Sequence, residues 1–151
     1  MSRRYAAVGE GAAGTDKAIM EVVAATTTRG WIYDILIGTD ASPLDLAGQF
    51  DIIRGSAAGT GSPTAITPRA LDGANPASLL TANAQTWTAD PTKTANSSML
   101  MIGLNQRATF RWVAAPGGEI VIPATSAARV LLNSTAHGGT PNINCTMHWE
   151  E

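Results

Sequence analysis

Apolar and polar residues alternate with a period of two over much of the chain. The C-terminal segment 141–151 shows this most clearly, because every second residue is apolar: Ile143, Cys145, Met147 and Trp149. The residues between them are polar. Such alternation is typical of a β-strand with one face in a core and one face in water. The pattern therefore predicts strands rather than amphipathic helices.

The same period predicts further strands along the chain. They cover residues 3–8, 18–25, 30–37, 49–54, 85–88, 99–104, 109–114, 119–122 and 129–132. Gly, Pro, Asn and Asp separate these short segments, which is typical of a sandwich or barrel. One short helical turn is expected at 76–84, with Asn75 as its N-cap and Pro76 in its first position. We predict an all-β chain: an antiparallel two-sheet sandwich of jelly-roll type, with about eight strands and minimal helix.

The phase of the alternation also predicts the core. The residues expected to be largely buried are Phe110, Trp112, Ile143, Met147 and Trp149. Segments 31–37 and 99–102 are apolar in both phases, so a strand there needs cover on both faces. That cover could come from a crossing loop or from another chain.

The chain has 151 residues, the length of one ordinary domain. We expect residues 1–151 to form a single β-sandwich domain with a long excursion at about 55–84, rich in Gly, Ser, Pro and Ala. Long structureless segments are uncommon in compact domains and are usually functional or disordered. Two interpretations stay open: a flexible surface loop, or an arm that becomes ordered against a neighbouring subunit.

Charge and cysteine content narrow the class of protein. Charged residues make up 15% of the chain and the net charge is −2, which gives no basic footprint for nucleic acid. We expect no nucleic-acid and no membrane partner, because no apolar run approaches the length of a membrane span. The single cysteine, Cys145, allows no disulfide within the chain. The N-terminus lacks the pattern of a secretory leader, so we expect a protein made in the cytoplasm.

Candidate catalytic chemistry is sparse. Residues 9–14 match the G-x-G-x-x-G pattern of dinucleotide-binding sites, but no helix is predicted after them. We interpret the match as a glycine-rich turn that links two strands. Cys145 and His148 are three residues apart, which places them on opposite faces of a strand and prevents them from sharing a metal ion. We therefore predict no catalytic residue, no cofactor, no metal site and no enzymatic activity.

The candidate functional residues are instead those of an interface. Eight of the ten cationic residues are arginines, and arginine is favoured over lysine at interfaces. Alternation places Arg107, Thr109 and Arg111 on one strand face, either as a solvated stripe or as a contact for an acidic neighbour. The full candidate set adds residues from the doubly apolar strand and from the excursion: Ile32, Leu36, Gly55, Gly59 and Pro63.

A family resemblance adds to this interpretation. The stretch LNQRATFRWVAAPGGEIVIPAT at 104–125 resembles small β-sandwich structural proteins of tailed bacteriophages, and segments 3–17 and 31–37 are similar to the same group. Members decorate or cement the capsid shell, commonly as jelly-roll trimers. The resemblance implies a homotrimer that binds the major capsid protein of a phage shell. It also implies a location on the capsid surface of the virion, after assembly in the bacterial host cytoplasm.

One alternative belongs to a different functional class: a receptor- or carbohydrate-binding sandwich module of a phage fibre or spike. Such a module needs aromatic side chains exposed on a sheet face or a loop. The candidates for these exposed aromatic side chains are Trp31, Trp87, Trp112 and Trp149. Three of these four tryptophans, however, are in the core-facing phase of their strands.

Overall fold

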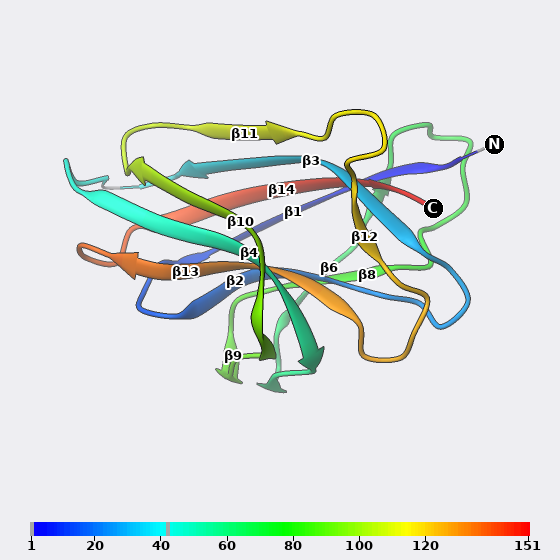
Figure 1. Cartoon of the computed structure of the whole chain (residues 1–151), viewed down its shortest axis with the longest axis horizontal. Coiled ribbons are helices and arrows are strands. Elements are labelled where there is room, and N and C mark those ends of the chain that lie inside the picture. Colours follow the sequence, from blue (N-terminus) through cyan, green and yellow to red (C-terminus); the bar gives the residue numbers. More distant parts are fainter. Residues whose placement is uncertain (1, 42) are drawn as a thin grey trace.

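The computed structural model describes residues 2–41 and 43–151, and within these ranges it contains strands and no helix. Figure 1 shows two large sheets stacked as a sandwich, with a small third layer beneath. The predicted all-β sandwich is therefore confirmed. The helical turn expected at 76–84 is wrong: Thr81–Ala84 is a strand that pairs with residues 20–23.

Eight strands build the sandwich. They are β1 (Arg4–Ala12), β2 (Lys17–Val23), β3 (Gly30–Thr39), β4 (Ala47–Ala57), β10 (Thr92–Asn105), β11 (Phe110–Val113), β13 (Arg129–His137) and β14 (Asn142–Glu150). The first sheet has the order β11-β3-β14-β1 and the second the order β10-β4-β13-β2, with antiparallel neighbours throughout. The chain alternates between the sheets except at the step from β4 to β10. This is the strand order of a jelly roll with its two Greek keys.

Six shorter strands complete the structure: β5 (Thr60–Gly61), β6 (Thr64–Ile66), β7 (Arg69–Ala70), β8 (Thr81–Ala84), β9 (Trp87–Ala89) and β12 (Ile120–Ile122). Strands β8 and β6 extend the second sheet beyond β2, while β7 pairs with β1 and β12 with β3. Strands β5 and β9 pair with each other in a separate ribbon.

The excursion predicted at 55–84 has a different character in the structure. Gly55 is buried within β4, opposite Arg129 on β13, so the excursion begins only after this strand. Strands β5, β7 and β8 pair with β9, β1 and β2 outside the segment, and β6 pairs with β8 within it. The segment is therefore joined to the sandwich by strand pairs within its own chain.

The main core lies between the two sheets. Ile143, Met147 and Trp149 are buried there as predicted, and Trp149 stacks on Tyr5 with ring centroids 6.2 Å apart. Trp112 and Phe110 are only half-buried against this core. They are buried less completely than the residues of β14 because β11 is the edge strand of its sheet and has a strand neighbour on one side only.

A second, smaller core lies on the outer face of the second sheet. Ala18, Ile53 and Leu131 are buried there, with Trp87 of the β5–β9 ribbon packed against them. The chain thus covers this part of the outer face of the second sheet by itself, although these residues lie outside the two segments for which cover was predicted. The cover predicted for 31–37 and 99–102 is incomplete, because Leu36 is 37% and Met101 61% exposed.

A β-bulge explains the misleading pattern of β3. Asp34 pairs with His148, but the next pair joins Ile32 to Trp149, so Tyr33 is an extra residue in the ladder. A bulge shifts the phase of a strand by one residue. Ile32 and Ile35 therefore both face the core although they are three positions apart.

Candidate interaction surface on the first sheet

The outer face of the first sheet carries several exposed apolar side chains. Strand pairing aligns Val8, Thr146, Leu36 and Arg111 in one row across β1, β14, β3 and β11. Val8 is 62% exposed, and Val113 in the adjacent row is 56% exposed. Exposed apolar groups beside polar ones are typical of protein contact surfaces.

A buried carboxylate lies at the centre of this face. The bulge turns Asp34 outward, and its side chain is only 4% exposed. Arg111 donates two hydrogen bonds to it, Nε to Oδ1 at 3.0 Å and Nη2 to Oδ2 at 2.6 Å. His148 Nδ1 lies 3.3 Å from Oδ2. The hydrogen bonds from Arg111 are the main cause that lowers the pKa of Asp34; His148 adds to this effect, while burial opposes it.

A second ion pair lies further along the same face. Arg4 Nε donates to Glu150 Oε1 at 2.7 Å, and the Arg4 guanidinium lies 5.5 Å from the centre of the Tyr33 ring. The Tyr33 ring in turn stacks on His148 at 6.0 Å. The two arginines therefore neutralise the two carboxylates, which lowers the electrostatic cost of covering this face with another protein.

A hollow of about 370 Å³ opens between β3, β11 and β14. Gly38 has no side chain to fill it, and the methyl group of Thr109 lies 3.4 Å from the point where a Cβ would stand. Three residues of the predicted interface set line this hollow together: Leu36, Thr109 and Arg111. The hollow thus combines apolar side chains such as Leu36 and Phe110 with polar ones such as Thr109 and Arg111.

The other predicted interface residues lie elsewhere. Ile32 is wrong as an interface residue, because its side chain is fully buried in the main core. Gly55 is also wrong, since it is buried in β4 with Arg129 and Leu131 side chains against it.

The remaining three are accessible but separate from the hollow. Arg107 is exposed in the turn before β11, where its N–H donates to Asn105 Oδ1 at 2.9 Å. It therefore does not share a strand face with Arg111. Gly59 and Pro63 are half-buried and flank β5 of the ribbon.

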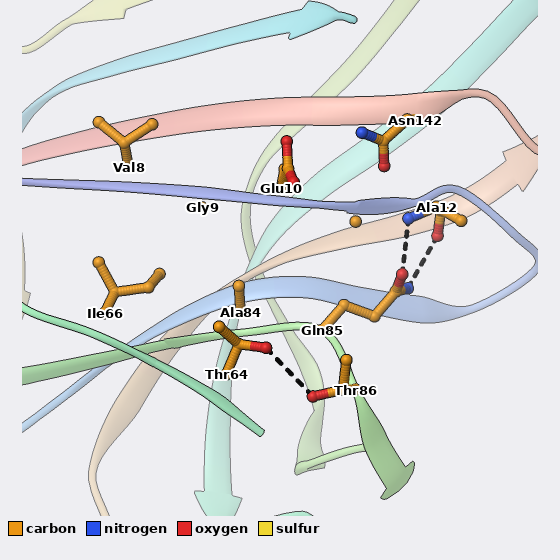
Figure 2. A pocket seen from close by; sticks show the side chains of 11 residues that line it. Val8, Gly9, Glu10, Ala12, Thr64, Ile66, Ala84, Gln85, Thr86 and Asn142 are labelled. Atoms are coloured by element: carbon orange, nitrogen blue, oxygen red, sulfur yellow. Dashed lines mark hydrogen bonds between the residues drawn. The ribbon is translucent and has the colours of Figure 1, made fainter. Parts of the chain in front are cut away.

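The G-x-G-x-x-G match has a structural role that differs from the predicted turn. Gly9 and Gly11 lie inside β1 and face inward, and only Gly14 belongs to the connection to β2. They line a groove of about 280 Å³ between β1 and the edge of the second sheet, shown in Figure 2. A Cβ on Gly11 would stand 2.7 Å from the Gln85 side chain, so glycine permits this close approach.

Nothing in the described parts of the chain forms a metal-binding cluster of three or more His, Cys, Asp or Glu side chains. Cys145 faces the core, where burial strongly raises the pKa of its thiol, and His148 faces outward. The two side chains therefore lie on opposite faces of β14, as predicted. The described residues also contain no helix that is long and apolar enough to span a membrane.

Comparison with known proteins gave no match. No protein-family model matches the chain, and neither a curated protein nor a solved structure does. The fold class therefore follows from the strand order itself, and the functional argument from the geometry of the first sheet.

Proposed function

We propose that this chain is a bacteriophage virion structural protein that decorates and cements the outer capsid surface as a homo-oligomer, with the trimer as the expected state. The face of the first sheet around Leu36, Thr109 and Arg111 is its contact surface. One observation carries the proposal: this face combines a hollow of about 370 Å³ with the exposed side chains of Val8, Leu36 and Val113, whereas the β5–β9 ribbon packs over Ala18, Ile53 and Leu131 of the second sheet.

The family resemblance supports the same surface. The stretch 104–125 contains Thr109, Phe110 and Arg111, which line the hollow, and it continues into β12. Part of the stretch that resembles phage decoration proteins is therefore available for contact, while Ile120 and Ile122 of the same stretch lie in the core. Such proteins act by binding and do not catalyse a reaction. A face with paired charges and a largely apolar hollow suits binding of this kind.

Binding alone would stabilise a shell. A protein that binds only the assembled lattice shifts its stability by mass action, and several copies joined in one oligomer gain from a high effective concentration. An interface of the usual specific size buries about 1,600 Å² in total. The apolar part of such an interface contributes roughly 25 cal/mol for each Å² removed from water.

The test compares one disruptive variant with a matched control. Leu36→Asp places a charge in the hollow, while Met101→Asp places the same charge on β10 of the second sheet, where Met101 is 61% exposed. Sedimentation equilibrium reports the oligomeric state, and co-sedimentation with shells of the parent phage reports binding. We expect Leu36→Asp to weaken both at least tenfold and Met101→Asp to leave both unchanged. A parent chain that is monomeric at millimolar concentration and does not bind shells contradicts the proposal.

A receptor- or carbohydrate-binding module is the second candidate, and one observation favours it. Trp31 lines a hollow of about 430 Å³ together with Glu119 and Glu150. A half-buried indole beside polar acceptors suits the flat face and hydroxyl groups of a sugar. Trp149, by contrast, is buried in the core and excluded. A glycan array with the parent chain and Trp31→Ala distinguishes this candidate, which requires binding by the parent that the variant loses.

A further inference from the structure

Strand β1 has an edge that is open over its middle. The backbone groups of its odd-numbered residues form hydrogen bonds with β14. The same pattern continues just beyond both strand ends, where Arg3 N–H donates to Glu151 O at 3.1 Å and Ala13 N–H donates to Pro141 O at 2.8 Å. In an antiparallel pair, alternate residues of a strand direct their backbone N–H and C=O groups to the opposite edge. The backbone N–H and C=O groups of the even-numbered residues of β1 therefore point away from β14.

Both ends of this opposite edge are occupied. Near the N-terminus, Arg4 O accepts from Leu71 N–H at 2.8 Å, and β7 pairs with Tyr5 and Ala6. Near the C-terminus, the Gln85 side-chain amide contacts one residue twice: its Oε1 accepts from Ala12 N–H at 2.6 Å and its Nε2 donates to Ala12 O at 2.8 Å. That amide makes the pair of bonds that a residue of an added strand would make.

The middle of the edge is free. The backbone N–H and C=O groups of Val8 and Glu10 have no hydrogen-bond partner among the described residues. Figure 2 shows Val8 and Glu10 on β1 above the groove, with Ile66 and Ala84 on the strands below. An open edge of this kind is a template for pairing with another chain.

The groove beside this edge has a size and lining that suit an extended peptide. Its volume of about 280 Å³ is bounded on the far side by Thr64, Ile66 and Thr86. Gly9 contributes no side chain, and a Cβ there would stand 3.0 Å from Ile66 Cδ1, so only a small inward side chain fits. An extended segment of three residues is roughly 10 Å long, which is enough to run from opposite Glu10 to opposite Val8.

We propose that this edge binds an extended segment of a partner protein as an additional antiparallel strand. The two pairs of free backbone groups give the affinity, and alternate side chains give the specificity. Glu10 is exposed and lies in no salt bridge within the described chain, so the residue opposite it is basic. Because the added strand is antiparallel, its first residue lies opposite Glu10, its second opposite Gly9 and its third opposite Val8. We therefore expect a basic residue, then a small residue, then a β-branched residue from the N- to the C-terminus of the segment. This inference does not depend on the proposed function.

The test is an amide NMR titration of the full chain with one probe peptide, acetyl-Lys-Ser-Val-amide, whose three residues lie opposite Glu10, Gly9 and Val8. We expect the resonances of Val8 and Glu10 to move, and the hydrogen exchange of both amides to slow at least tenfold at saturation. A second peptide, N-methylated at Lys and Val, has the same side chains but lacks the two donors. It should bind at least tenfold more weakly.

Two variants separate this mode from non-specific attraction. Glu10→Lys reverses the charge on an exposed side chain, so binding of the Lys probe should fall about 1.4- to fivefold, in line with roughly 0.2–1 kcal/mol for an exposed cross-strand pair. The peptide with Glu in place of Lys should then bind this variant better than the parent chain. Asp45→Lys, an exposed residue between β3 and β4, should leave the affinity unchanged. The proposal is overturned if Val8 and Glu10 do not respond to millimolar probe, or if N-methylation has no effect.

Discussion

Arg111 holds Asp34 through two parallel hydrogen bonds that join the edge strand β11 to β3. The carboxylate is almost fully buried, whereas the guanidinium is largely exposed. An exposed side chain thus supplies the donors that a buried acceptor requires, and such charge-assisted bidentate pairs are strong and directional. The same arginine lines the hollow on the first sheet. A partner that contacts this hollow would therefore contact a residue that also stabilises the fold.

This relationship predicts how stability depends on pH. The pKa of Asp34 in the folded chain lies below its ordinary value of 3.8. A group with a depressed folded pKa contributes stability that is complete above its unfolded pKa and is lost as pH falls through the folded pKa. We expect the free energy of unfolding to fall below about pH 4, and Asp34→Asn to fall less steeply there. Urea denaturation between pH 7 and pH 2.5 measures both slopes. Asp72→Asn, on an exposed turn, is the control and should retain the parent slope.

A second charged pair allows a prediction about burial. Arg129 Nη1 donates to Glu21 Oε2 at 2.9 Å on the outer face of the second sheet, and both side chains are at least nine-tenths buried. Removing one partner leaves a buried charge without compensation, which typically costs about 3–5 kcal/mol. Arg129→Met should therefore lower the free energy of unfolding by that amount, as measured by urea denaturation. The double variant with Glu21→Met should recover part of the loss. A double variant no more stable than Arg129→Met alone would contradict the electrostatic explanation.

Burial also ranks the two large aromatic residues of the first sheet. Trp149 is fully buried and stacked on Tyr5, so Trp149→Ala should cost about 3–5 kcal/mol. Trp112 is half-buried on an edge strand, and Trp112→Ala should cost only about 1–2 kcal/mol because less apolar area leaves the core. Chemical denaturation of both variants tests the order. Equal losses would show that Trp112 contributes more than its burial indicates.

The alternation of residues predicts the main strands well because one face of each strand packs against the opposite sheet. Segment 141–151 shows this, since all four apolar residues of β14 are buried as their phase predicts. Strand β3 shows where the rule fails, because its bulge at Tyr33 depends on pairing with His148 and Trp149, more than a hundred positions away. A local pattern contains no record of such a register shift.

The candidate site was predictable in part for the same reason. Leu36, Thr109 and Arg111 could be selected from residue type and phase, and the structure places them in one hollow. Asp34 and Gln85 were missed because their roles come from partners 77 and 73 positions away. The one local signal for Gln85 is the pair of inward glycines in β1, which indicates that another segment approaches closely.

The side chain of Glu151 leads to the last prediction. Its carboxylate accepts from the N–H groups of Leu79 at 3.0 Å and Leu80 at 3.1 Å, from the Ser78 hydroxyl, and from Trp149 Nε1 at 3.1 Å. These bonds hold the segment before β8 against the end of β14. Glu151→Ala removes all four acceptor contacts at once, so the Leu79 and Leu80 amides should exchange with solvent at least tenfold faster. Hydrogen exchange measured by NMR tests this, with the Val22 amide in β2 as an internal reference. Unchanged exchange at both leucines would show that packing of the fully buried Leu80 side chain is enough to fix the segment.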